Sequence, residues 1–277
     1  MTVSLLHACE GGGEGRPPLA PALHETPPTP PADEPSEGDD PAPPAPALTA
    51  RIPSPPAPPD AGSACPGDMV IVDGLYCPKP KQVCKRWVDP PTSRYADFRC
   101  AEYAQPSICL SPSRVHERFC IDREEYVRPG DELPLANQSW TGASKICASL
   151  GKRLCLESEW QLACEGEEMR PYPYGFVRDA SLCNIDQAHL GRPQEGLRDL
   201  RAPTSAYPQC LSPYGVHDMS GNVEEWATLD HGAPPDRSTM KGAWWLPGKN
   251  NCRAATLGHG EIYLGPQVGV RCCREAE

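Results

Sequence analysis

Fourteen cysteines between Cys65 and Cys273 constrain the fold of this chain more than any other feature. The sequence of 277 residues has fifteen cysteines, and only Cys9 lies outside that region. A zinc site needs close C-x-x-C pairs with further Cys or His nearby, and the spacings here provide none. The pattern therefore favours disulfides and an extracytoplasmic location, in the periplasm or at the cell surface. The adjacent Cys272 and Cys273 cannot readily bridge each other, so we expect them to reach different partners.

Proline divides the chain into a tail and a folded part. The sequence has 36 prolines, and runs of them fill residues 17–59, which lack aromatic residues and are poor in Leu, Ile and Val. Such a segment buries too little apolar surface to offset its ordering entropy. We therefore predict a disordered, partly polyproline-II tether over 10–63 and a folded domain over 64–277. A recognition arm for a proline-binding partner is the alternative.

Cys9 ends an apolar run in the step Leu6-His7-Ala8-Cys9, which resembles the lipobox of bacterial lipoproteins. In that motif the cysteine is lipidated and becomes the mature N-terminus. Without Cys9, fourteen cysteines remain, an even number that permits seven disulfides. Only eight residues precede Cys9, fewer than a signal peptide normally has. We expect residues 1–9 to be a truncated signal segment and Cys9 a lipid anchor; an accidental match is the alternative.

Charge and hydropathy narrow the classes of partner. The net charge is −11, and no cluster of Lys and Arg interleaves with aromatic residues, which argues against nucleic acid. No stretch approaches the roughly 18 apolar residues of a membrane span. We therefore expect a monomer that contacts the membrane only through its lipid anchor. Its ligand at the cell envelope, a protein or a glycan, is not identified by the sequence.

Local patterns predict short strands and one unusual insertion. A β-type run at 69–72 should end at Asp73-Gly74, and a second strand is expected at 118–122. Residues 77–118 are rich in Cys and Pro without a clear period, which predicts a disulfide-stapled insertion.

Two helices stand out. The first is expected over 139–150, with Ser139 as N-cap and an inward face of Trp140, Ala143, Cys147 and Leu150. The second is expected over 157–165, with Trp160 among its inward residues. The remaining chain shows little periodicity, so we expect short strands and long loops. The fold class is therefore α+β, with little regular secondary structure.

Seven sequence blocks then follow one another in the order of a known family. They are GKRLCLESEW at 151–160, YPYG at 172–175, CNI at 183–185, YGVHDMSGNVEEW at 214–226, MKGAWW at 240–245, CRAA at 252–255 and GVRC at 269–272. Together they resemble the formylglycine-generating-enzyme or sulfatase-modifying-factor family. The resemblance implies a single α+β domain of the C-type-lectin-like kind. The family includes copper oxidases that convert a sulfatase cysteine to formylglycine, and members without catalysis.

The residues needed for that oxidation are incomplete. The family holds Cu(I) between two thiolates spaced C-x-x-x-x-C just after G-G-S, because the soft ion prefers sulfur. Here Trp244 replaces the serine and Pro247 stands at the first cysteine. Cys252 matches the second cysteine by count, or a structural cysteine by its C-R-x-A motif. We therefore expect Cys252 in a disulfide, no copper and no formylglycine synthesis. An oxidoreductase of the same type with an atypical metal site is the alternative.

The resemblance also implies two structural calcium sites, because the family binds calcium through its N-I-x and G-N-x-x-E-W blocks. Calcium prefers many oxygen ligands, including backbone carbonyls of ordered loops. Carried across by position, one set of ligands is Asn184, Ile185 and Asp199. The other is Gly221, Asn222, Val223 and Glu225. In the alternative interpretation, the asparagines cap turns and Glu225 pairs with an arginine.

Two tryptophans fall where the substrate groove of the family would open. Trp244 and Trp245 are candidates for an aromatic binding platform, and His259 is expected near the rim. The alternative is that the two tryptophans fill a dead active site. We expect a non-catalytic binding or structural module of the cell envelope.

Overall fold

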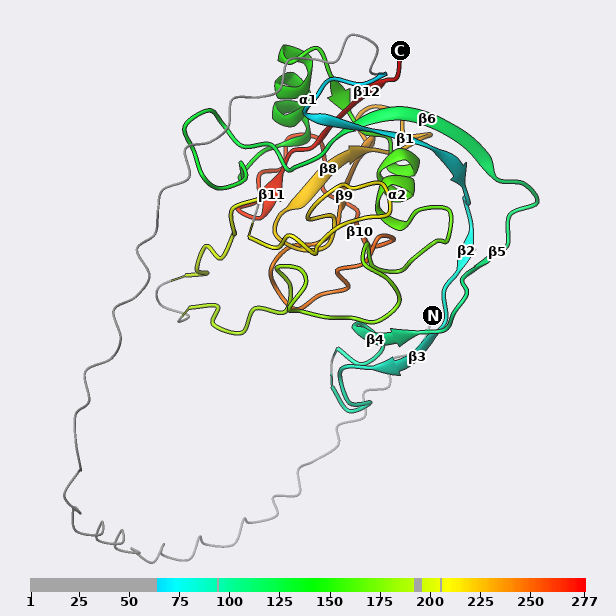
Figure 1. The fold of residues 1–277 in the computed structure, drawn as a ribbon. Helices are drawn as coiled ribbons and strands as arrows, with labels where there is room; N and C mark the ends of the chain where they lie inside the picture. The colour runs from blue at the N-terminus through cyan, green and yellow to red at the C-terminus, as the bar shows by residue number, and fades with distance from the viewer. Residues whose placement is uncertain (1–63, 94, 192–195, 205) are drawn as a thin grey trace, which may run out of the picture. The chain divides into compact units, whose positions relative to one another are not determined.

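The computed structural model describes residues 64–93, 95–191, 196–204 and 206–277. The predicted signal segment 1–9 and tether 10–63 lie outside these residues. The described part folds as an α+β domain with little regular secondary structure, as the sequence predicts (Figure 1). No helix in this part of the chain combines the length and the apolar character needed to cross a bilayer.

The first sheet is antiparallel and has the strand order β1-β6-β12-β7. Helix α2 (Glu157–Glu165) packs against β1 and β6, and its Trp160 and Leu162 are fully buried there. The sheet pairs β1, near the start of the described chain, and β12, near its end, with strands from the middle of the chain. It therefore holds the two ends of the domain together. Its strands are β1 (Met69–Tyr76), β6 (Val115–Asp122), β7 (Arg153–Leu154) and β12 (Cys272–Glu275).

The second sheet has the order β10-β9-β8-β11, in which β11 pairs with β8 in parallel. Helix α1 (Trp140–Ser149) contacts β8, and Trp140 shares an apolar cluster with Trp226 of that strand. This sheet therefore brings Trp226 into a second core together with Trp140. Its strands are β8 (Glu224–Thr228), β9 (Ser238–Lys241), β10 (Ala255–Thr256) and β11 (Val268–Gly269).

The predicted insertion extends the β1–β6 pair into a long curved ribbon (Figure 1). Along it, β2 (Pro80–Lys81) pairs with β5 (Ile108–Cys109), and β3 (Cys84–Trp87) pairs with β4 (Cys100–Tyr103). The disulfides Cys77–Cys109 and Cys84–Cys100 link the two sides of the ribbon. The two predicted disulfide staples are therefore present in this segment, and its status as an insertion stays a prediction.

The structure corrects both strand predictions. The first strand does not end at Asp73-Gly74, because β1 continues to Tyr76 in unbroken register with β6. Gly74 marks close packing, not a turn: the Tyr214 hydroxyl lies 2.2 Å from where a Cβ would stand. The partner strand β6 begins at Val115, three residues before the predicted 118, since its pairing follows β1 outward.

Both helices lie where they were predicted. Ser139 caps α1, because its hydroxyl accepts a hydrogen bond from the Gly142 amide at 3.0 Å. Of the predicted inward residues of α1, Trp140, Ala143 and Cys147 are buried. Leu150 is not; it is 46% exposed because the helix ends at Ser149 and the chain turns there.

The described residues contain seven disulfides, which use all fourteen of their cysteines. Cys272 and Cys273 reach different partners, as expected: Cys147 of α1 and Cys155. Both bridges fix the last strand to the middle of the chain. The remaining links are Cys65–Cys120, Cys164–Cys252 and Cys183–Cys210. This many disulfides indicate an oxidising, extracytoplasmic location.

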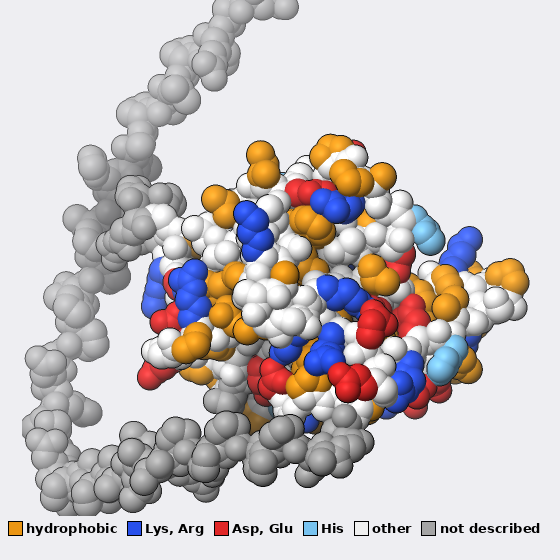
Figure 2. Space-filling model, turned by 90° about the horizontal axis from the view of Figure 1, so that it is seen from above, with side chains coloured by type: hydrophobic (Ala, Val, Ile, Leu, Met, Phe, Trp, Pro, Cys, Tyr) orange, Lys and Arg blue, Asp and Glu red, His pale blue; other side chains and the backbone are white. Residues whose placement is uncertain are grey.

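Acidic and basic side chains lie interspersed on the face shown in Figure 2, without one continuous field of either sign. Within the described residues many acidic and basic side chains form ion pairs, as Arg153 does with Glu159 at 2.6 Å. Such pairs neutralise part of the charge of the domain.

Candidate functional site

Cys252, the residue on which copper chemistry would depend, is bonded to Cys164 of α2 with an S–S distance of 2.04 Å. Both side chains are fully buried. The expectation that Cys252 is bridged is confirmed. Because every cysteine of the described residues is disulfide-bonded, these residues offer no thiolate pair for Cu(I).

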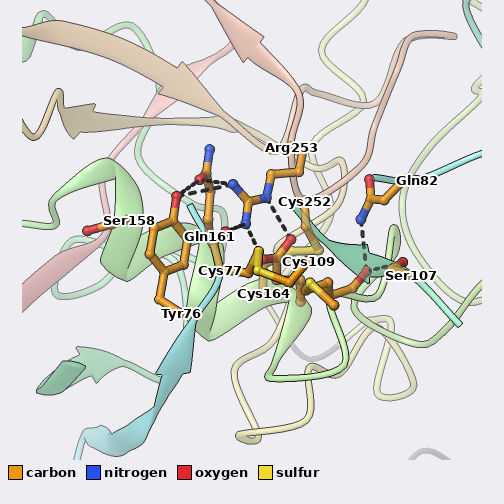
Figure 3. A network of polar contacts seen from close by, with 12 residues as sticks. Tyr76, Cys77, Gln82, Ser107, Cys109, Ser158, Gln161, Cys164, Cys252 and Arg253 are labelled. Carbon is orange, nitrogen blue, oxygen red and sulfur yellow. Dashed lines mark hydrogen bonds and ion pairs between the residues drawn. A yellow bond between two sulfur atoms is a disulfide. The ribbon is translucent and has the colours of Figure 1, made fainter. Parts of the chain in front are cut away.

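Arg253 follows Cys252 in the sequence, and all three nitrogens of its guanidinium group donate hydrogen bonds (Figure 3). Its Nη1 donates to the Tyr76 hydroxyl at 3.1 Å and to Gln161 at 2.8 Å. Its Nε donates to Glu165 at 2.7 Å, and its Nη2 donates to Glu165 and to the Cys77 carbonyl. Burial raises the pKa of Tyr76 to about 12, which keeps this hydroxyl neutral. The network ties α2 to β1 and to the insertion, so it is structural.

Trp245 lies apart from that network, at the wall of a cavity of about 850 Å³. The residue is 2% exposed, and its indole Nε1 has no hydrogen-bond partner within the described residues. Trp244 packs edge-on against it, with ring centroids 4.8 Å apart and planes at 63°. The predicted groove residues are therefore adjacent, but only Trp245 lines the cavity. His259 does not; its ring stacks on Tyr263 at 3.9 Å.

The cavity lies between loop 128–137 and segment 197–201. Arg201 joins these two walls, because its guanidinium donates to the Pro134 carbonyl and pairs with Asp199 at 2.6 Å. The apolar part of the lining comes from Leu133, Leu135, Leu197 and Pro266, among others. A volume of this size falls within the range of small-ligand sites.

A buried amide network holds the wall in place. Asn222 accepts from the Ala202 amide at 2.8 Å and donates to the Ala202 carbonyl at 3.1 Å, as a neighbouring strand would. Asn184 donates to Asn222 at 3.0 Å and to the Leu200 carbonyl at 2.8 Å. Gln187 links the network to the cavity. Its side chain donates to Asn184 at 2.9 Å, and its backbone N–H donates to the Trp245 carbonyl at 2.9 Å. The network therefore positions segment 197–201 and Trp245 together.

Gly221 and Val223 complete this support. A Cβ at Gly221 would lie 2.2 Å from the Asn184 carbonyl oxygen and 2.5 Å from the Ile185 side chain. Gly221 also has a φ of +89°, which favours glycine. The Val223 amide donates to Glu125 at 3.1 Å, and Glu125 accepts from Asn222 at 2.5 Å. Burial is the main cause that raises the pKa of Glu125 above its usual range.

The side chains of the two predicted sets of calcium ligands are bonded to protein groups. Glu225 lies in β8, where Arg271 donates to it at 2.7–2.9 Å and Trp160 at 2.6 Å. Asp199 pairs with Arg201. The Asn184 and Asn222 side-chain oxygens accept from protein amides. Protein donors thus contact these side-chain oxygens, and calcium binding stays a prediction. No group of three or more His, Cys, Asp and Glu in the described residues has metal-site geometry.

Sequence reasoning missed the residues that shape the cavity. Arg128, Arg198 and Arg201 lie outside the seven blocks, and Glu125 follows a predicted strand without a motif. For Glu125, which supports the wall, the signal is the acidic pair Glu124-Glu125 shortly after the strand, of which one member is buried. The cavity itself has no local signature, because its walls are far apart in sequence.

The fold and the site together define a disulfide-stapled α+β domain with a closed cysteine pair and a separate tryptophan-lined cavity. Residues 95–276 match the sulfatase-modifying factor enzyme 1-like domain, so the chain belongs to this family. The resemblance seen in the seven blocks is confirmed.

Curated relatives point the same way. Inactive C-alpha-formylglycine-generating enzyme 2 of Mus musculus is 31% identical over 161 residues, which cover 54% of this chain and 52% of that protein. The protein of the same name from Bos taurus is 30% identical over 161 residues, covering 54% and 53%. The chain thus spans about half the length of these relatives. The crystal structure of CarF shares the fold, with a TM-score of 0.53, 16% identity and coverage of 76% and 98%.

Proposed function

We propose that the domain is a non-catalytic binding module of the cell envelope, with its ligand site in the cavity beside Trp245. The observation that carries the first part is the Cys164–Cys252 disulfide, which uses the thiol that the copper chemistry of the family would need. Pro247 supplies no second thiol. The word inactive in the names of the two mammalian relatives supports the same proposal.

The second part rests on the cavity. A buried indole donor without a partner is rare in a folded protein and points to a site where something else supplies the acceptor. Trp245 has such a donor, and it lines the cavity of about 850 Å³. Two walls joined by Arg201 and supported by the Asn184–Asn222 network give the cavity a preformed shape, which lowers the cost of binding.

Thiol counting tests the non-catalytic part. The purified chain is alkylated in denaturant without reductant and analysed by mass spectrometry, and we expect no label on any cysteine from Cys65 to Cys273. A parallel titration with Cu(I) should show no stoichiometric binding at the domain. The Cys164→Ala variant, which frees Cys252, is the positive control for labelling. Label on Cys252 of the unmodified chain, together with one equivalent of bound Cu(I), would overturn the proposal in favour of an oxidase.

We also propose that Cys9 anchors the protein to a membrane. The fourteen described cysteines pair among themselves, so none is left over for Cys9. Mass spectrometry of the native N-terminal peptide should find an acylated Cys9, and the Cys9→Ser variant should leave the membrane fraction. An unmodified Cys9 preceded by the intact residues 1–8 would contradict this anchor.

A further inference from the structure

The side chains that line the cavity indicate which chemical class of ligand it binds. The Trp245 indole is a donor only, so it selects a ligand that offers an acceptor. Arg128 and Arg198 also line the cavity, and their guanidinium groups contact no acceptor among the residues that the structure describes. Arg201, by contrast, is saturated by Asp199 and the Pro134 carbonyl. Two exposed guanidinium groups and one buried indole N–H without a partner thus lie around one cavity.

We propose that this cavity binds a peptide segment of a partner protein in which an aspartate or glutamate is flanked by aliphatic residues. This inference rests on the proposed binding role of the cavity. A carboxylate is an acceptor-only group that two guanidiniums and an indole N–H can all bind. An ammonium group, which only donates, leaves the indole unsatisfied.

The apolar lining favours aliphatic side chains over sugar rings. Leu133, Leu135 and Leu197 supply it, together with two prolines. The single aromatic residue of the lining, Trp245, is 2% exposed and presents no open ring face to a glycan. An acidic, aliphatic peptide therefore matches both the donors and the walls better than a carboxylated sugar does.

Two acids on the same rim provide an internal control. Asp131 and Glu132 line the cavity beside Arg128, and they repel an acidic ligand. Removing them should therefore tighten binding of such a ligand, whereas removing the arginines should weaken it. A cationic ligand would show the reverse pattern for both variants.

The experiment follows the indole N–H resonance of Trp245 in the ¹⁵N-labelled full chain, assigned with a Trp245→Phe variant. The probes are the peptide Ac-Leu-Glu-Leu-NH₂, its Gln and Lys counterparts, and sodium glucuronate. We expect the Glu peptide to shift this resonance at a concentration about tenfold lower than the Gln peptide, because a charge-assisted contact is lost. The Arg128→Gln/Arg198→Gln variant should remove that preference. The Asp131→Asn/Glu132→Gln variant should enhance it.

The outcomes separate this inference from the binding role on which it rests. Equal or better binding of the Lys peptide, or an arginine double variant that keeps the preference, overturns the acidic ligand but leaves a binding cavity. A response to glucuronate alone replaces the peptide with a carboxylated glycan. If no probe moves the Trp245 resonance, the proposed role of the cavity fails together with the ligand class.

Discussion

Asp218 is 2% exposed and lies before β8 in the sequence. The buried Arg271, between β11 and β12, donates to the carbonyl of the preceding residue, His217. Burial raises the pKa of its carboxyl group to about 8. The positive charge of Arg271 opposes this rise, and the negative charges of Glu124 and Glu225 add to it. One oxygen of Asp218 has no hydrogen-bond partner in the described residues. The folded protein therefore keeps a proton on Asp218 that the unfolded chain releases near its ordinary pKa of 3.8.

Because of this difference, we expect the stability of the domain to depend on pH. Between about pH 4 and pH 8 the folded state binds more protons than the unfolded state, so the free energy of unfolding falls as pH rises. Asn resembles the protonated acid, so the Asp218→Asn variant should lose less stability over this window than the unmodified chain. Urea midpoints at pH 5 and pH 8 measure the effect. The negative charge of Asp218 also raises the pKa of the buried Glu125, so the difference between the two proteins measures this pair of acids. Equal slopes would contradict the prediction.

The Asn222 side chain tests whether the domain depends on calcium or on its own hydrogen bonds. Asn222 pairs with Asn184, Ala202 and Glu125 inside the protein. Replacing it by alanine leaves buried partners without hydrogen bonds and should cost about 3 kcal/mol of stability. Chelation with EGTA should leave the melting temperature of the unmodified chain unchanged. If EGTA lowered that temperature as the Asn222→Ala substitution does, calcium would be holding the wall instead.

At the scale of elements, the sequence predicted both helices with their bounds, whereas it located the strands β1 and β6 but made them too short. Capping by Ser139 and the spacing of apolar residues are local signals, and both helices begin within one residue of their predicted starts. The extension of β1 through Gly74 depends on pairing with β6, some 40 residues away, and on the Tyr214 hydroxyl. Because this pairing is non-local, the sequence around Gly74 alone predicts a turn instead of a continuing strand.

The disulfides of the ribbon and of the core should contribute differently to stability. Cys84–Cys100 spans 16 residues within the β3–β4 pair, and Cys155–Cys273 joins β12 to the residue after β7. Loop length does not separate them, because the neighbouring Cys147–Cys272 bridge already closes nearly the same loop as Cys155–Cys273. Cys155 and Cys273 are fully buried, so alanine leaves a cavity in the core, whereas Cys84 is half-buried. We expect the Cys155→Ala/Cys273→Ala variant to unfold at lower urea than the Cys84→Ala/Cys100→Ala variant. The reverse order of midpoints would show that the loop closed by Cys84–Cys100, and not packing of the core, dominates.

At the scale of the whole molecule, the seven blocks predicted the family and the fold because they contain the buried tryptophans and glycines of the two cores. Trp160 and Trp226 are at most 1% exposed, and Gly221 lies against the Asn184 carbonyl. The cavity could not be predicted in the same way. Its walls at 128–137 and 197–201 lie outside the blocks, and Arg201 joins them through the Pro134 carbonyl.

Disulfide burial then predicts the order in which the molecule can be reduced. In the insertion, Cys84 and Cys109 are partly exposed, so each of its two bridges has one accessible sulfur-bearing residue. Cys147–Cys272, Cys155–Cys273 and Cys164–Cys252 have both residues fully buried. A reductant can reach these three bridges only when the domain opens globally.

Timed treatment with a phosphine reductant, followed by alkylation and mass spectrometry, should therefore label Cys84, Cys100, Cys77 and Cys109 first. The three core bridges should follow together, at the rate of global unfolding, because each of them becomes accessible only when the domain opens globally. Adding about 2–3 M urea should accelerate reduction of the core bridges much more than reduction of the insertion bridges, because urea promotes global unfolding. Early, separate reduction of Cys164–Cys252 would show that this pair is accessible in the folded state, and it would reopen the question of a metal-binding thiol pair.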